Sequence, residues 1–398
     1  IVGIFFARKL YRMNLLTLGD FFRKRFGPNV ELITSLVIMA SYLGWIAAQL
    51  TALGVVFNVL SDGSITTTQG MLIGTAIVLV YTLFGGMWSV AVTDFMQMII
   101  LVGGLSVLAY FAGDMAGGAD KVVSLVVSRD LFKFWPEPSF HDMVFFFAAA
   151  ITMMLGSIPQ QDVFQRVMSA NSVNAATKGP VIGGVAYILF AFVPMFLVAS
   201  ALIIMPEQTA ALLKDDPQKV LPTLVMEKMP FFMQVLFFGA LLSAIKSTAS
   251  ATLLAPSVTF TENIWRQFHP RVSDKQELRT MRITVLVFSV LVLIYAIRME
   301  GTPIYEMVSG AYQVPLVGAF VPLVMGLYWK KASTQGAIAA VVLGIGVWLL
   351  FLGTSMGEVF PAQLAGVLSA FAGMVVGSLA PQLIRDTRIA HRLIPEVV

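Results

Sequence analysis

One short stretch near the middle of the chain carries three residues that could bind an ion. Ala244, Ser247 and Thr248 follow the spacing i, i+3, i+4, so a helix would present them on one face. A backbone carbonyl and two hydroxyls are oxygen ligands without net charge, which suits a monovalent cation such as Na⁺. The same small residues would also let two helices pack closely. The three residues alone leave both interpretations open.

Lys246 stands inside this stretch, directly before the Ser–Thr pair. At about 100° per residue its side chain points roughly 200° away from Ala244, off the candidate ligand face. A charge in an apolar segment needs a partner, and Asp94 is the natural candidate for an ion pair. Two other roles remain open. The ammonium could extend to the membrane interface, or it could act as a tethered cation that weakens sodium coupling or transfers it to protons.

Asp94 lies in the stretch YTLFGGMWSVAVTDFMQ (81–97), two turns beyond a glycine pair that predicts a tight turn at 85–86. An acid at that depth is too far along the helix to belong to an ordinary loop. It could cap neighbouring backbone groups or line a path for cations. The residues by themselves favour neither role.

A proline interrupts a second apolar segment, at SIPQQDVFQR (157–166). Pro159 removes a backbone hydrogen bond, and Gln160 and Gln161 follow at once. A broken helix with amides at this position would offer polar groups to a solute or an ion. The simpler alternative is a frayed helix end. We expect Gln160 to be the residue that faces a solute.

A third polar cluster lies in the segment 301–334, where Tyr312 and Gln313 precede Pro315. We interpret this segment as a second interrupted helix. Tyr312 and Gln313 could contact a solute, or they could belong to an interfacial belt of polar and aromatic residues.

The composition limits the classes of protein that could use these residues. Of the 398 residues, 58% are hydrophobic and 12% are charged, whereas soluble domains carry about 25% charged residues. The chain is therefore predicted to be a membrane protein. The absence of cysteine excludes thiolate metal sites, and no nucleophile–base pair or metal-ligand set lies at membrane depth. We expect neither an enzyme nor a bound cofactor.

A helix needs about 20 apolar residues to cross a membrane. By this criterion residues 1–398 form a single transmembrane domain with a stub at 1–10 and ten full spans. The spans are expected near 30–60, 69–86, 88–113, 140–168, 179–205, 231–255, 281–299, 303–329, 335–354 and 361–384.

The basic residues are unevenly divided between the two sides of this layout. Eighteen of the 26 Lys and Arg residues lie on the side where the stub ends, against seven on the other. This bias predicts that the stub side is cytoplasmic. The even number of spans then returns the basic segment 385–392 and the C-terminus to the cytoplasm, in a plasma (inner) membrane. The net charge of +4 reflects topology, so a nucleic-acid partner is not expected.

With these segments together, the chain resembles the sodium:solute symporter family, which includes the proline, sodium–glucose, pantothenate and sialic-acid carriers. The matching stretches are LTLGDFFRKRFG, YTLFGGMWSVAVTDFMQ, IPQQDVFQR, GALLSAIKSTASATLLAPSVTFTENIW and YEMVSGAYQVPLVGAFVPLVMGLYWKKA. The resemblance implies an all-α polytopic membrane protein with a LeuT-type core of two inverted five-helix repeats. The core would be incomplete at the N-terminus, and two extra helices would follow it.

The resemblance also implies roles for single residues. The sodium ligands on the eighth core helix would be the carbonyl of Ala244 and the hydroxyls of Ser247 and Thr248. Asp94 would lie on the inner sodium exit path, and Gln160 would face the solute. The chain departs from the family at Lys246, where relatives usually carry an apolar residue. By the same resemblance, the first core helix, which would complete the sodium site, is expected to have no counterpart among these residues.

We therefore expect a secondary active transporter that couples a small organic solute to Na⁺ by alternating access. Its partners would be the solute, Na⁺ as the coupling ion, and the lipid bilayer. Two alternatives remain: a transporter-like membrane sensor module, or a proton-coupled or sodium-independent carrier because of Lys246.

Overall fold

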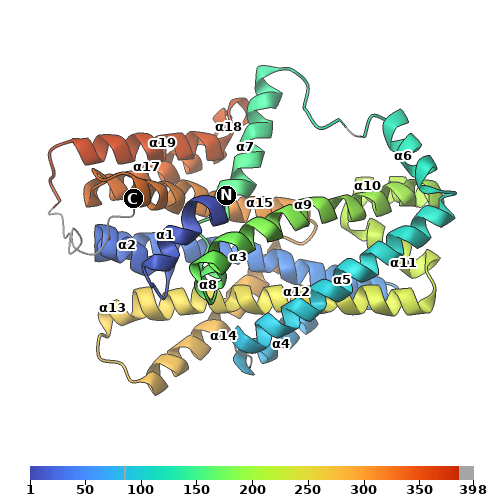
Figure 1. Ribbon diagram of the computed structural model, residues 1–398, viewed down its shortest axis with the longest axis horizontal. Coiled ribbons are helices and arrows are strands. Elements are labelled where there is room, and N and C mark those ends of the chain that lie inside the picture. The colour runs from blue at the N-terminus through green and yellow to red at the C-terminus, as the bar shows by residue number, and fades with distance from the viewer. Residues whose placement is uncertain (85–86, 132, 385–398) are drawn as a thin grey trace.

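The computed structural model describes residues 1–84, 87–131 and 133–384, with the side chains of 84, 87–91 and 93 excepted. Within these ranges the chain forms helices and turns and no strand. The fold is an all-α bundle (Figure 1), as expected. Two predicted features, the turn at 85–86 and the basic segment 385–392, lie outside the described residues.

Eight of the described helices are long and apolar enough to cross a membrane, and a bent pair adds a ninth if it crosses as one span. The eight are α3 (Pro28–Leu60), α5 (Met87–Met115), α9 (Val173–Ile204), α12 (Phe231–Thr259) with its continuation, α14 (Asp274–Arg298), α15 to α16 (Ile304–Tyr328), α17 (Thr334–Leu352) and α19 (Ala362–Leu379). The bent pair is α7 (Phe140–Gly156) and α8 (Gln161–Met168). The one remaining expected span, near 69–86, corresponds to α4 (Thr67–Phe84), whose apolar part is shorter than that of the other spans.

Shorter helices connect these spans. The first described residues form a π-helical turn, η1 (Val2–Phe6), and α1 (Ala7–Arg12). The other short elements are α2 (Leu18–Phe26), α6 (Ala119–Ser128), α10 (Pro206–Asp215), η2 (Pro217–Lys219), α11 (Val220–Lys228), η3 (Phe260–Trp265), α13 (Arg266–Phe268) and α18 (Met356–Val359). The sequence fixes the start of α2 through a reciprocal cap, because Thr17 accepts from the Asp20 backbone while Asp20 accepts from the Thr17 backbone.

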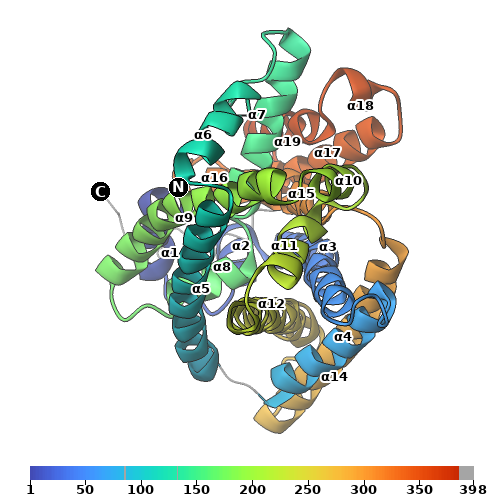
Figure 2. The ribbon, with the colours of Figure 1, turned by 90° about the vertical axis from the view of Figure 1, so that its right-hand side faces the viewer.

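The long helix α12 occupies the centre of the bundle. Figure 2 shows it nearly end-on, with α3, α4, α5 and α11 around it. It packs against α3, α4, α5 and α14. α17 and α19 pack against each other at one side of the bundle, whereas α7 packs against α15 and extends beyond the bundle at its other end (Figure 1). A central α12 brings its polar residues close to several neighbours at once.

The two expected helix interruptions take different forms. α7 and α8 are inclined by 47° across the break at 157–160. The segment 301–334 contains no comparable break: α15 (Ile304–Pro315) runs through a π-helical turn, η4 (Leu316–Phe320), into α16 (Val321–Tyr328). A proline lacks a backbone N–H and clashes with the carbonyl four residues before it. The wider π-turn after Pro315 accommodates this misfit without ending the span, so the expectation of a second broken helix was wrong.

Candidate functional site

Two serines on one face of α12 contact polar side chains of α5. The Ser247 hydroxyl donates a hydrogen bond to Oδ1 of Asp94. One turn earlier, Ser243 Oγ accepts a hydrogen bond of 2.8 Å from Gln97 Nε2. The structure therefore joins one of the expected sodium ligands to the residue expected on the sodium exit path.

The three expected ligand residues differ in burial. Ser247 is 2% exposed, whereas Ala244 and Thr248 are half-buried. The Ser247 hydroxyl lies against the Asp94 carboxylate. Both oxygens are suitable ligands for Na⁺. The Ser247 hydroxyl can rotate its hydrogen aside and present a lone pair to an ion, so Ser247 and Asp94 already hold two such oxygens at a common position. Among the described residues no group of three or more His, Cys, Asp or Glu could hold a metal ion.

A neighbouring face of α12 lies against α4. Thr82 Oγ1 donates a hydrogen bond of 2.9 Å to Ser250 Oγ, and both side chains are buried. Beside this pair, the Lys246 ammonium lies over the ring of Tyr81, with Nζ 4.1 Å from the ring centroid. α12 therefore makes polar contacts to α5 through Ser243 and Ser247, and to α4 through Lys246 and Ser250.

The expected ion pair between Lys246 and Asp94 does not form. Over the part of the chain that the structure describes, the ion pairs include neither residue. Successive residues of a helix point about 100° apart. Because Ser247 faces Asp94 on α5, Lys246 is turned toward α4. There its ammonium makes a cation–π contact with the Tyr81 ring.

The break between α7 and α8 places Gln160 deep inside the bundle. Gln160 Nε2 donates a hydrogen bond of 3.0 Å to Ser41 Oγ on α3. The side chain is 1% exposed, and its Oε1 is buried without a partner in the described structure. Since a buried polar atom without a hydrogen bond costs about 1–3 kcal/mol, this oxygen is a candidate acceptor for a bound solute or water.

Gln161 points elsewhere. Its Oε1 accepts a hydrogen bond of 2.8 Å from the backbone N–H of Leu18, one of the unpaired donors at the start of α2. Its Nε2 is buried without a partner among the described residues. Gln161 therefore joins α8 to α2, a contact that the sequence gave no reason to expect.

Tyr312 and Gln313 also have defined partners. Tyr312 on α15 stacks on Trp45 of α3, with ring centroids 5.3 Å apart and an interplanar angle of 30°. Gln313 Oε1 accepts a hydrogen bond of 2.9 Å from Trp348 Nε1 on α17. Tyr312 and Gln160 thus contact the same face of α3, because their partners Trp45 and Ser41 are one turn apart on that helix. The Gln313 side chain instead contacts α17 through Trp348.

The sequence reasoning missed the contribution of α3 to this region. Besides Ser41 and Trp45, this face carries Tyr42, a wholly buried residue. The Tyr42 hydroxyl donates to Oδ1 of Asp162 at 2.6 Å and accepts from the Asp162 backbone N–H at 2.9 Å. The signal was present in the sequence: Ser41, Tyr42 and Trp45 are polar or amphipathic residues grouped in an otherwise apolar span.

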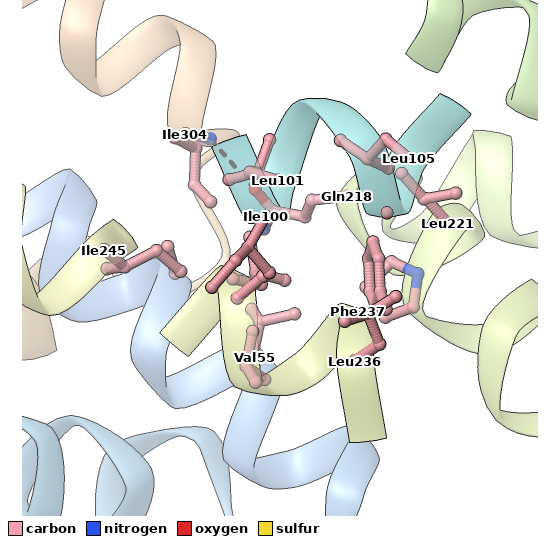
Figure 3. A pocket seen from close by; sticks show the side chains of 16 residues that line it. Val55, Ile100, Leu101, Leu105, Gln218, Leu221, Leu236, Phe237, Ile245 and Ile304 are labelled. Carbon is pink, nitrogen blue, oxygen red and sulfur yellow. Dashed lines mark hydrogen bonds between the residues drawn. The ribbon is translucent and has the colours of Figure 1, made fainter. Parts of the chain in front are cut away.

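A cavity of about 250 Å³ lies between α3, α5, α11 and α12, next to the start of α15 (Figure 3). Its walls are apolar apart from Gln218, whose Oε1 accepts a hydrogen bond of 3.1 Å from the Ile304 backbone N–H. None of the four expected solute residues lines it. Because Ile245 forms part of the wall, the cavity lies beside the polar stretch of α12 rather than at the helix break.

Comparison with known proteins decides the family. The model of the sodium:solute symporter family matches residues 1–344. The chain belongs to the sodium:solute symporter family. Its family is one of transporters, and the chain is a multi-pass integral membrane protein, as the residues and the resemblance predicted.

Individual relatives agree with the family assignment. The chain is 27% identical to a high-affinity choline transporter of Drosophila melanogaster, over 87% of this chain and 56% of that protein. It is 27% identical to the high-affinity proline transporter PutP of Bacillus subtilis, over 94% of this chain and 79% of that protein. The chain thus spans little more than half the length of the choline transporter.

A solved structure supports the expected fold. A Na⁺-coupled sialic acid symporter in a substrate-bound outward-open state superposes with a TM-score of 0.74 at 22% identity, covering 96% of this chain and 81% of that one. The LeuT-like architecture expected for this symporter-family chain is therefore confirmed.

Proposed function

We propose that this protein carries a small organic solute across the membrane together with Na⁺, by alternating access. The observation that carries the proposal is the contact between Ser247 on α12 and Asp94 on α5. It brings a hydroxyl of the expected sodium ligand set against a carboxylate inside the bundle, in a chain that belongs to a sodium symporter family.

The proposed ion site consists of the Ala244 carbonyl and the Ser247 and Thr248 hydroxyls, with Asp94 on the path by which Na⁺ leaves. An ion can shift a conformational equilibrium only by its different affinity for the two states. Movement of α12 against α5 would separate Ser247 from Asp94 and alter the ligand set. That relative movement is the step at which binding of Na⁺ would be coupled to a change of conformation.

The proposed solute site lies at the break between α7 and α8. Three groups support it: the unpaired Oε1 of Gln160, the stacked rings of Trp45 and Tyr312, and the hydroxyl of Ser41. A carbonyl oxygen and aromatic faces together favour a solute that carries a positively charged nitrogen beside apolar carbons. Choline and proline, the solutes named for the relatives, both have this chemistry and are the first compounds to test.

The proposal is tested by uptake of labelled proline and choline into proteoliposomes, with an inward Na⁺ gradient compared with a K⁺ gradient. Ser247→Ala and Thr248→Ala should each raise the Na⁺ concentration for half-maximal uptake by about tenfold, since a lost ligand of this kind is worth roughly 1–2 kcal/mol. Ser106→Ala is the matched control, because Ser106 is an exposed serine of α5 whose hydroxyl donates to the Val102 carbonyl of its own helix. Unchanged sodium dependence in both ligand variants would refute the proposed ion site.

A further inference from the structure

Lys246 has a fixed place that the proposed transport cycle does not explain. Its side chain is half-buried, and its ammonium lies 4.1 Å from the centroid of the Tyr81 ring on α4. It directly precedes Ser247, whose hydroxyl is bonded to Asp94 on α5. A positive charge and a candidate sodium ligand thus occupy adjacent residues and face different helices.

Neighbouring contacts hold this arrangement in register. The hydrogen bond between Thr82 and Ser250 joins α4 to α12 one residue beyond Tyr81 and one turn beyond Lys246. The hydrogen bond between Gln97 and Ser243 joins α5 to α12 on another face. These contacts to two different helices oppose rotation of α12. The ammonium is therefore kept on the α4 side while Ser247 stays on the α5 side.

We propose that Lys246 is a built-in cation that sets the sodium affinity of the neighbouring site, and that Tyr81 holds it off Asp94. The inference rests on the proposed sodium site. Lys246 and Asp94 already balance each other in charge within this part of the bundle, so an added Na⁺ enters a region with no excess negative charge. Two like charges repel strongly where water is scarce.

Tyr81 has the second role in this inference. A lysine side chain is long and flexible, and Asp94 is the carboxylate that faces the next residue of α12. A Lys246 ammonium released from the Tyr81 ring would turn toward Asp94 and compete with Na⁺ for its oxygens. The ring thereby keeps the repulsion moderate and the Asp94 carboxylate accessible to the ion.

The first test removes the charge. Lys246→Met should lower the Na⁺ concentration needed for a half-maximal effect by about tenfold or more, because it removes a like charge from the neighbourhood of the ion at a low effective dielectric constant. Lys246→Arg is the matched control, because it keeps the charge and can still lie on the Tyr81 ring. The measurement is the Na⁺-dependent rise in the melting temperature of the purified protein, with KCl making up constant ionic strength, alongside uptake.

The second test releases the charge. Tyr81→Leu should raise the Na⁺ requirement several-fold, and Tyr81→Phe, which keeps the aromatic face, should change it little. In the Lys246→Met background, Tyr81→Leu should have no further effect on the Na⁺ midpoint. An equal effect of Tyr81→Leu in both backgrounds would show that Tyr81 acts by packing alone and would overturn its part of the inference.

The possible results separate this inference from the proposed function. If the wild-type protein responds to Na⁺ and Lys246→Met leaves the midpoint unchanged, the inference is overturned and the sodium site stands. If the wild-type protein shows no response and Lys246→Met gains one, the role of Lys246 is supported and sodium coupling of the native chain is refuted. If no variant responds to Na⁺, both are overturned.

Discussion

Gly156 ends α7 against the backbone of α15, where there is no room for a side chain. A Cβ atom at this position would lie 2.3 Å from the Tyr312 carbonyl oxygen. Tyr312 is the residue that stacks on Trp45, so the spacing between α7 and α15 fixes the proposed solute site. A single missing methyl group thus controls how closely two parts of that site approach.

Gly156→Ala should therefore disturb both stability and solute binding. Overpacking at a backbone contact costs about 1–3 kcal/mol, and it should lower the melting temperature of the purified protein together with solute affinity. The control is Gly183→Ala within α9, where an added Cβ meets no atom within 4 Å. Alanine there should be neutral or slightly stabilising, because it is the better helix former. Equal behaviour of the two variants would contradict the close approach.

At the scale of elements, one buried carboxylate joins three of them. Glu31 on α3 is wholly buried and accepts hydrogen bonds from Asn263 at 2.9 Å and from Gln267 at 2.6 Å. Arg23 on α2 lies 3.7 Å from the same carboxylate. The continuation of α12 beyond residue 259 is thereby connected to α2 and α3. Gly19 on α2 makes this possible, since a Cβ there would overlap Asn263.

Asn263→Ala should weaken this connection. It removes a donor from a buried carboxylate, at an expected cost of about 1–3 kcal/mol, which thermal unfolding of the purified protein would report as a melting temperature lower by several degrees. Asn29→Ala is the control, because Asn29 is an exposed residue in the first turn of the same α3. A melting temperature as little affected by Asn263→Ala as by Asn29→Ala would count against a stabilising role.

The contacts of α12 show how far the sequence could predict the candidate site. Helical periodicity gave the angle between Lys246 and Ser247, but it did not give the rotation of α12 relative to α4 and α5. That rotation decides which residue meets Asp94, and it depends on packing along the whole helix. The partner of Lys246 was therefore predicted wrongly. Likewise, nothing local to Gln161 indicated that its Oε1 would accept a hydrogen bond from the backbone N–H of Leu18.

At the scale of the whole molecule, the fold was largely predictable, because long apolar segments must form helices in a membrane. The break at Pro159 was also predictable, since the chemistry of proline is local. The continuity of the span through Pro315 was not, because η4 is almost entirely buried and the surrounding helices hold its backbone in place. Side-chain pairings between distant helices were the part that sequence patterns left undetermined.

The orientation of the bundle in the membrane is a final prediction from charge. Basic residues gather at the end that carries α2 and α13, while α10 and α11 lie at the opposite end (Figure 1). The positive-inside rule makes the first end cytoplasmic. The chain contains no cysteine, so single cysteines can be introduced into the wild-type protein at exposed positions of each end, as Lys331→Cys after α16 and Lys214→Cys in α10.

A membrane-impermeant maleimide added to right-side-out vesicles should label the Lys214→Cys variant and leave the Lys331→Cys variant unlabelled until the membrane is permeabilised. The reason is electrostatic: at the α2 end, charges such as Arg23 and Arg266 are retained on the cytoplasmic side during insertion. The inverse labelling pattern would reverse the orientation. It would also exchange the two sides of the proposed cycle, so that the Asp94 path would open outward and Na⁺ would enter, rather than leave, along it.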